Sequence, residues 1–223
     1  MNNGFNAENN PAPESGAGNI LVEDNAVLHI LGGHLDFLEK EGKALGKLLD
    51  IGAKSGQFLQ MAEARGFKVS GVETNNELAN IGRNNGLDIR TGTLADLPKV
   101  ESFYDVITIF NFAKILRDPQ NDLKQISKML TDDGFMIVTT NNQKHGNQST
   151  AEYTNMLESL GLQIAKSGPI VHRHSISSFF EHLNTKLHLS LLRSVSHFFK
   201  NHSSIDLALS LGEPSGYFLI GKK

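Results

Sequence analysis

The chain has 223 residues, 39% of them hydrophobic, and this length and composition suit one α/β domain with a buried core. The absence of cysteine excludes disulfides and thiolate metal sites, and a net charge of −3 with scattered Lys and Arg argues against a nucleic-acid-binding protein. No run of about 18 apolar residues and no N-terminal export signal are present, so we expect no transmembrane segment and a cytoplasmic location.

The N-terminal part of the chain divides into a tail and a helical segment. Residues 1–19 are rich in Asn, Gly, Pro and Ala, which predicts a disordered tail. Apolar residues then recur at helical spacing, which predicts a helical cover over residues 20–42. We expect this cover to belong to a single domain that spans residues 20–223.

Two features of this cover bear on its shape and role. The pair Gly32-Gly33 lies in the middle of the helical pattern and predicts a split into two helices. His29 and His34 lie on the same segment, and we interpret them as helix-surface histidines in preference to catalytic ones.

Strand-like and helix-like segments alternate along most of the remaining chain. Strands are predicted at residues 47–51, 67–72, 87–90, 104–110, 135–140, 162–165 and 217–220. Helices are predicted at 57–65, at 74–86, from Pro119 with Asp118 as N-cap, and at 149–161. Such alternation predicts an α/β fold in which a mostly parallel sheet has helices on both faces.

The first strand ends in a glycine loop that carries an acid. The run K-L-L-D-I-G-A-K-S-G places Asp50 at the strand end and Gly52 and Gly56 in the loop. The dinucleotide pattern G-x-G-x-x-G is missing, and a carboxylate here would repel a pyrophosphate, so a nicotinamide-dependent oxidoreductase is disfavoured. Asp50 suits an ammonium group instead. Glu73, after the next strand, can accept hydrogen bonds from both hydroxyls of a ribose.

This pattern is similar to the first motif, D-x-G-x-G-x-G, of class I S-adenosylmethionine-dependent methyltransferases. The run G-T-L-A-D-L-P from Gly92 to Pro98, the strand F-Y-D-V-I-T-I-F-N and the segment L-K-Q-I-S-K-M-L-T-D-D-G-F also resemble that family. The resemblance implies a Rossmann-like seven-stranded fold whose last strand is antiparallel and lies between strands 5 and 6. It also implies S-adenosyl-L-methionine as the cofactor.

The resemblance assigns roles to residues at the carboxyl edge of the sheet. Asp50 would contact the amino end of the cofactor, and Glu73 would hold its ribose. The remaining positions would give close backbone approach (Gly52, Ala53 and Gly56), contact the adenine (Thr93 and Leu94) and lie near the methionine part (Asn111).

Two departures from the family pattern affect the predicted site. Lys54 replaces the middle glycine of the first motif, which is tolerable if its side chain points to solvent and its backbone needs no positive φ. Lys114-Ile115 replaces the Glu-His that many relatives carry before the Asp-Pro at 118–119, so no catalytic base is assigned. His145 is the best-placed candidate for a base, although an ordinary loop histidine is the favoured interpretation.

Residues 170–214 are predicted to be a helical insertion between the last two strands. Its apolar residues fit a lid over the acceptor pocket, a homodimer face or a membrane-surface contact, in that order of preference. The insertion is rich in histidine, and His172-x-His174 has the spacing of a metal pair. A third ligand at a convincing spacing is missing, so we expect no metal site.

The leading hypothesis is a methyltransferase that acts on a small-molecule acceptor, at oxygen. A catalytically inactive protein of the same fold, serving as a cofactor-binding or partner subunit, is the alternative that the departures at Lys54, Thr93 and Lys114-Ile115 leave open. A nucleic-acid acceptor is disfavoured, because the chain reads F-N-F-A after the fourth strand where such enzymes carry N/D-P-P-Y/F.

Overall fold

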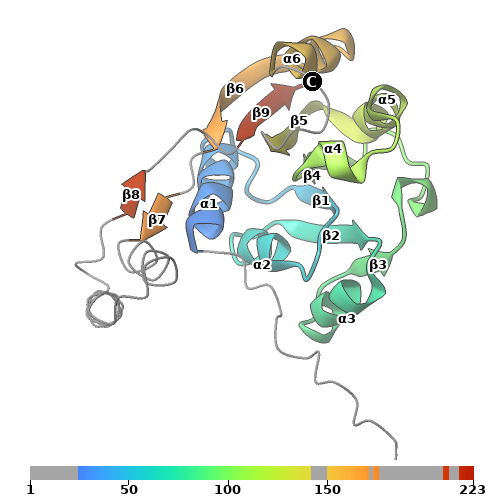
Figure 1. Cartoon of the computed structure of the whole chain (residues 1–223). Coiled ribbons are helices and arrows are strands. Elements are labelled where there is room, and N and C mark those ends of the chain that lie inside the picture. The colour runs from blue at the N-terminus through green and yellow to red at the C-terminus, as the bar shows by residue number, and fades with distance from the viewer. Residues whose placement is uncertain (1–24, 142–149, 171–172, 176–207, 211–215) are drawn as a thin grey trace, which may run out of the picture.

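The computed structural model describes residues 25–141, 150–170, 173–175, 208–210 and 216–223 (Figure 1). In chain order the elements are α1 (Asn25–Lys40), β1 (Lys47–Ile51), α2 (Gln57–Glu63), β2 (Lys68–Glu73), α3 (Asn76–Asn84), β3 (Ile89–Thr91), the 3₁₀ helix η1 (Leu94–Asp96), β4 (Tyr104–Ile109), α4 (Phe112–Ile115), α5 (Pro119–Met129), β5 (Leu130–Asn141), α6 (Thr150–Ser159), β6 (Gln163–Ile170), β7 (Arg173–Ser175), β8 (Ala208–Ser210) and β9 (Gly216–Lys222).

A seven-stranded sheet forms the centre of the molecule, with strand order β3-β2-β1-β4-β5-β9-β6. Strands β1 to β5 pair in parallel, and β9 runs antiparallel to both β5 and β6. The predicted fold is therefore confirmed, including the place of the last strand. The chain reverses its direction of winding between β1 and β4, and ligands of open α/β sheets bind outside the carboxyl ends of such a pair of strands.

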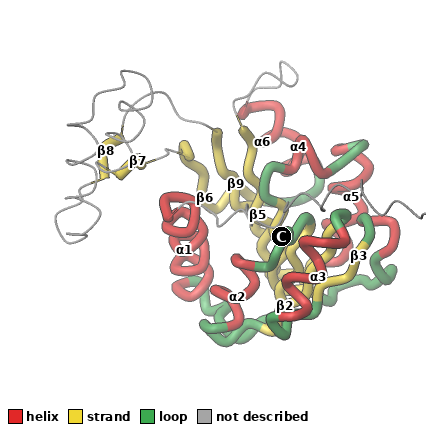
Figure 2. Tube along the Cα trace, turned by 60° about the horizontal axis from the view of Figure 1, so that its bottom comes forward, coloured by secondary structure: helices red, strands yellow, loops and turns green. Residues whose placement is uncertain are grey.

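Helices cover both faces of this sheet (Figure 2). Neighbouring residues of β1 point to opposite faces, so Leu48 joins one core and Leu49 joins the other. The first core includes Leu35 from α1, and the second includes Leu123 from α5 and Leu157 from α6. The two cores fix the sheet from both sides and hold the carboxyl ends of β1, β2 and β4 in place.

The N-terminal helix α1 is continuous, so the predicted split at Gly32-Gly33 is wrong. Arg65, just after α2, donates a hydrogen bond to the carbonyl oxygen of Gly32 at 3.0 Å. The same guanidinium group forms an ion pair with Asp36 at 2.9 Å. These contacts with the neighbouring helix support α1 across two glycines, each of which disfavours a helix by about 1 kcal/mol.

Several predicted segments lie wholly or largely outside the described residues. The tail at 1–19, the residue His145 and most of the insertion at 170–214 are among them. Within the insertion, β7 and β8 are described, and they pair antiparallel as a two-stranded sheet. The roles predicted for the insertion and its histidines therefore stay predictions.

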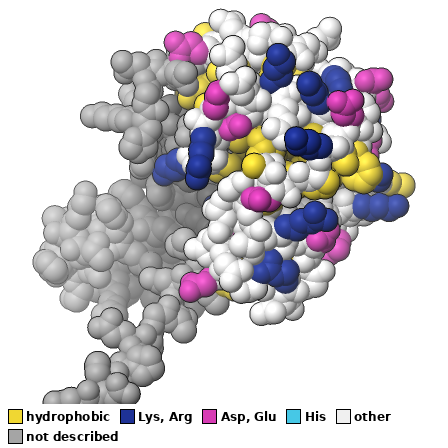
Figure 3. Space-filling view, turned by 90° about the vertical axis from the view of Figure 1, so that its right-hand side faces the viewer, with side chains coloured by type: hydrophobic (Ala, Val, Ile, Leu, Met, Phe, Trp, Pro, Cys, Tyr) yellow, Lys and Arg dark blue, Asp and Glu magenta, His cyan; other side chains and the backbone are white. Residues whose placement is uncertain are grey.

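The described surface carries mixed charges. On the face shown in Figure 3, Lys and Arg alternate with Asp and Glu, and a band of hydrophobic side chains runs between them. Among the helices that the structure describes, none is long and apolar enough to cross a membrane.

The two cores predict a sharp contrast between two leucines near β1. Leu49 is 1% exposed, whereas Leu45 is 81% exposed. We expect Leu49→Ala to lower the free energy of unfolding by about 3 kcal/mol, because it leaves a cavity in a packed core. The same truncation at Leu45 should change it by less than about 0.5 kcal/mol. Urea unfolding of both variants measures the difference, and equal losses would contradict the described packing.

Candidate functional site

The loop between β1 and α2 folds back onto β2. The backbone N–H groups of Gly52 and Ala53 both donate to the carbonyl oxygen of Val72, at 2.8 and 3.0 Å. Gly52 and Gly56 have φ values of +84° and +81°, which glycine adopts readily. The loop thereby exposes its backbone at the carboxyl edge of the sheet, as the sequence predicts.

The two glycines also make room for neighbouring side chains. A Cβ atom at Gly52 would lie 2.4 Å from Cδ1 of Ile115, so its absence lets α4 close over the loop. A Cβ atom at Gly56 would lie 2.2 Å from Cδ1 of Leu87. Gly56 lines neither of the two cavities described below, so its place is explained by its backbone conformation and by packing.

Lys54 adopts a left-handed conformation, with φ +50°. The condition that its backbone needs no positive φ is therefore not met. Its backbone N–H donates to Oε2 of Glu73 at 2.8 Å, and this bond couples the loop after β1 to the acid after β2. A left-handed residue other than glycine costs about 1–2 kcal/mol, which the surrounding hydrogen bonds must offset.

Glu73 is 8% exposed and is fixed through both of its carboxylate oxygens. Oε2 accepts from Lys54, while Oε1 accepts from the backbone N–H of Asn75 at 2.8 Å and from the Thr74 hydroxyl at 3.2 Å. A carboxylate offers about four acceptor sites, so these bonds orient Glu73 without exhausting its capacity. The side chain is thus held in place with an acceptor site on Oε2 left for a ligand.

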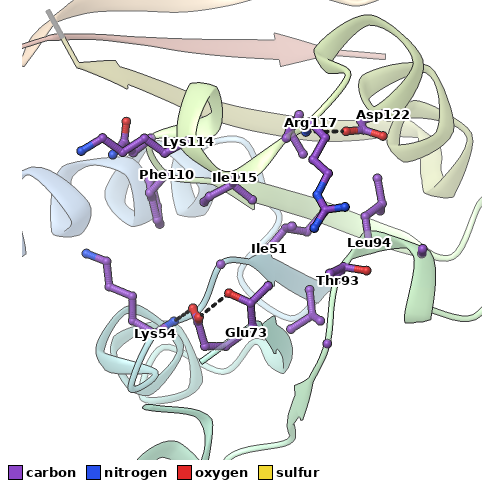
Figure 4. Close-up of a pocket in the computed structure, with 17 residues that line it drawn as sticks. Ile51, Lys54, Glu73, Thr93, Leu94, Phe110, Lys114, Ile115, Arg117 and Asp122 are labelled. Carbon is purple, nitrogen blue, oxygen red and sulfur yellow. Dashed lines mark hydrogen bonds between the residues drawn. The ribbon is translucent and has the colours of Figure 1, made fainter. Parts of the chain in front are cut away.

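A cavity of about 630 Å³ lies over the carboxyl ends of β1, β2 and β4, and a volume of this size is typical of a small-molecule site (Figure 4). It brings together five of the predicted site residues: Gly52, Glu73, Thr93, Leu94 and Asn111. They come from the carboxyl ends of four different strands and the segments that follow them, which the alternating strand–helix pattern predicts.

Thr93 and Asp96 form one unit at the far end of this cavity. Oδ2 of Asp96 accepts from the Thr93 backbone N–H at 2.8 Å and from the Thr93 hydroxyl at 2.9 Å. These two hydrogen bonds hold the pKa of Asp96 below its usual value. The family's acid is missing at position 93, and Asp96, which does not line the cavity, forms a capping box with Thr93 at the start of η1.

A second, smaller cavity of about 210 Å³ lies beside the first, between α1 and the glycine loop. Asp50 and Ala53 line it, and Gly52 and Asn111 line both cavities. Asp50 is 2% exposed, and its Oδ1 accepts from the Thr108 hydroxyl at 2.7 Å. All predicted site residues except Gly56 therefore line one of two adjoining cavities.

His34 also lines this second cavity, and it is only 4% exposed. The prediction that it is a surface histidine is wrong. Helical periodicity gave the correct inner face of α1, since Leu31, Leu35 and Leu38 are buried with it. Burial, assisted by the positive charge of Lys166, lowers the pKa of His34 to about 4, so the imidazole is neutral at pH 7.

Three residues that sequence reasoning did not assign to the site also line the larger cavity: Lys114, Ile115 and Arg117. Figure 4 shows that the Arg117 side chain extends across the cavity toward Leu94, while Lys54 and Lys114 lie at the opposite end. For Lys114 and Ile115, the departure from the family pattern could have indicated a place in the site, because the family has site residues at these positions.

The left-handed backbone of Lys54 predicts the order of stability of two variants. The free energy of unfolding of Lys54→Gly should equal that of the natural protein or exceed it by up to about 1 kcal/mol, because glycine relieves the strain but costs conformational entropy. Lys54→Val should be less stable than Lys54→Gly by about 2 kcal/mol, since a β-branched residue tolerates this conformation poorly. Both variants remove the same ammonium group, so urea unfolding compares the backbone effect alone.

The control for this pair is Lys68→Val, the same exchange at an exposed position of β2. It should change stability by less than about 0.5 kcal/mol. If Lys54→Val were as stable as Lys54→Gly, the left-handed conformation would be refuted.

The lowered pKa of His34 predicts a pH dependence of stability. Its ordinary pKa is 6.5, so below that pH the unfolded chain binds a proton that the native protein does not bind until about pH 4. Stability should therefore fall as the pH falls through this window, by about 3 kcal/mol in total. Urea unfolding at about pH 7 and about pH 4.5 should show a loss about 2 kcal/mol smaller for His34→Phe than for the natural protein. Identical losses would mean that His34 protonates freely.

Comparison with known proteins identifies the fold family. A family model for a methyltransferase domain matches residues 27–189. An uncharacterized methyltransferase of Staphylococcus carnosus (strain TM300) is 28% identical over 102 residues, which are 45% of this chain and 49% of that protein. The match thus spans about half the length of this curated relative.

Solved structures show the same architecture at low identity. A protein assigned as a sarcosine dimethylglycine methyltransferase from Galdieria sulphuraria aligns over 89% of this chain and 87% of its own, with a TM-score of 0.64 and 13% identity. Magnesium protoporphyrin IX methyltransferase from Synechocystis PCC 6803, solved with bound S-adenosylmethionine, aligns over 89% of this chain and 80% of its own, with a TM-score of 0.58 and 14% identity. Since the family model covers most of the chain, the protein belongs to the class I S-adenosylmethionine-dependent methyltransferase family.

Proposed function

We propose that this protein transfers a methyl group from S-adenosyl-L-methionine to the oxygen of a small-molecule acceptor. The observation that carries the proposal is Glu73, a buried carboxylate fixed through both oxygens beside a cavity of about 630 Å³. A ribose with two adjacent hydroxyls is a ligand that such a carboxylate fits, because one hydroxyl can donate to the acceptor site left on Oε2 and the other can replace the Thr74 hydroxyl at Oε1.

The residues around the two cavities fit the other parts of the cofactor. Thr93 and Leu94 would meet the adenine, and the Arg117 guanidinium is placed to pack against a planar ring. Asp50 would balance the ammonium group of the methionine part, and Lys54 and Lys114 give that end of the larger cavity a positive potential that suits its carboxylate. The donor set thus matches a ligand that is a nucleoside at one end and a zwitterion at the other.

The chemistry demands little acid–base work from the protein. When bound, S-adenosyl-L-methionine supplies an already activated methyl group on a sulfonium. The chain must then align the nucleophile and exclude water, and alignment alone can supply much of the rate acceleration. His34, with a pKa of about 4, is too weak a base to ionise an ordinary hydroxyl. An oxygen that ionises by itself, as in a phenol, enol or carboxylic acid, needs no base from the part of the chain that the structure describes, and it is the acceptor atom that we propose.

A matched pair of glutamates tests cofactor binding. Glu73→Gln replaces one acceptor oxygen by a donor, so we expect it to weaken binding of S-adenosylmethionine and S-adenosylhomocysteine about 10- to 100-fold. Glu77→Gln makes the same exchange on the exposed side of α3 and should leave the affinity within about twofold. Isothermal titration calorimetry measures the affinity of the natural protein and of both variants for the two compounds, and thermal unfolding checks that each protein is folded.

The outcomes separate the competing functions. Micromolar binding that depends on Glu73, followed by transfer of labelled methyl to small molecules, would support an enzyme. Binding without transfer to any acceptor pool would favour the inactive, cofactor-binding protein. Failure of the natural protein to bind either compound, or equal affinity of Glu73→Gln, would refute the proposed site.

A further inference from the structure

The second cavity adjoins the larger one, because four residues line both: Gly52, Lys54, Phe110 and Asn111. Its walls are mostly apolar, with Phe58 from α2 and Ile170 at the end of β6 among them. Within this apolar surrounding, Asp50 from β1 and His34 from α1 are the two ionisable groups with most of their surface buried. A ligand part that enters this space meets both groups.

His34 is held by aromatic rings and has an unused hydrogen-bonding nitrogen. Its imidazole stacks on Phe110 with ring centroids 6.3 Å apart and meets the edge of Phe218 at 4.9 Å. Nε2 is buried and has no hydrogen-bond partner in the part of the chain that the structure describes. Buried polar atoms normally have a partner, so an imidazole nitrogen without one, on a residue that lines a cavity, points to a missing ligand.

We propose that His34 is a cofactor-binding residue whose imidazole accepts a hydrogen bond from the ammonium group of the methionine part, in concert with Asp50. This inference rests on the proposed function, because it assumes that the cofactor's adenosine part occupies the larger cavity. It adds a contact from α1, an element outside the glycine loop and the strand ends to which the cofactor-binding roles are assigned above.

The electrostatics of the cavity favour an accepting imidazole. The charged groups around it are Asp50 and Lys54 from the glycine loop region and Lys166 from β6. Burial and Lys166 lower the pKa of His34 to about 4, so at neutral pH one ring nitrogen keeps its lone pair. A neutral ring carries its proton on one nitrogen and a lone pair on the other, so Nε2 can accept a hydrogen bond when the proton is on Nδ1. A protonated ring would instead repel an ammonium group.

The size and lining of the cavity favour the amino-acid end of the cofactor over the acceptor. A space of about 210 Å³ is large enough for a short amino-acid chain, and the backbone of the glycine loop forms one of its walls. Asp50, the acid predicted to meet an ammonium group, faces the same space. His34 and Asp50 would then share the donors of one ammonium, whose three N–H bonds allow two protein acceptors and a third partner.

Three cofactor fragments test this contact without a known acceptor. S-adenosylhomocysteine carries the whole amino-acid end, decarboxylated S-adenosylhomocysteine keeps only the ammonium group, and 5′-methylthioadenosine has neither group. Calorimetry should show that His34→Phe weakens binding of the first two about tenfold and leaves binding of 5′-methylthioadenosine within about twofold. His34→Gln, whose side-chain oxygen is an acceptor, should restore most of the lost affinity.

The pattern across ligands distinguishes a contact from a structural role. A damaged pocket would weaken all three ligands alike, and a loss confined to S-adenosylhomocysteine would place His34 on the carboxylate; either result overturns the proposal. Unchanged affinity for all three would overturn it too and would leave His34 to the acceptor. If the natural protein binds none of the three, the proposed function itself fails. Should His34→Phe not fold, equal selectivity of His34→Gln and His34→Ala for S-adenosylhomocysteine over 5′-methylthioadenosine would count against the contact.

Discussion

The hydrogen bond from the Lys54 backbone to Glu73 is the constraint on which the site depends. It joins the loop after β1 to the end of β2 at 2.8 Å, and the bonds from Gly52 and Ala53 to Val72 close the same junction. Lys54 has a strained, left-handed backbone conformation where it makes this bond, and the bond orients Glu73. A ligand that meets Glu73 therefore meets a carboxylate that the parallel pairing of β1 and β2 has already placed, and little of its binding energy is spent on ordering the loop.

Most of the fold and the first set of site residues could be predicted from the sequence, because they depend on local patterns. Short-range periodicity predicts the apolar run that ends at Asp50, the glycine loop and the next strand before Glu73. The N-cap at Asp118 is confirmed, since its side chain accepts from the backbone of Asn121 at 3.2 Å. Parallel pairing then brings strand ends together regardless of the distance between them in the chain.

The features that were missed depend on contacts between distant segments. His34 reads as a surface residue, because a histidine on an amphipathic helix has no sequence mark that places it between Phe110 and Phe218. The continuity of α1 depends on Arg65, more than thirty residues away, which bonds to Gly32. The conformation of Lys54 depends on its hydrogen bond to Glu73, and local backbone propensity takes no account of such a distant partner. In each case a tertiary contact outweighs a preference of about 1 kcal/mol.

The departures from the family pattern are compensated in space by neighbouring residues. At position 93 a threonine replaces the acid, and Asp96, which does not line the cavity, holds this threonine in place through two hydrogen bonds. At 115 an isoleucine replaces the histidine, and its side chain fills the space beside Gly52. The histidine that the family pattern places at position 115 is absent from α4, while a neutral histidine is present on α1 at the adjoining cavity. The backbone at position 93 is thus fixed, and the space beside Gly52 is filled, without closing the cavity of about 630 Å³. The departures therefore change the lining of the cavity and leave room for a cofactor, which favours a site that still binds it.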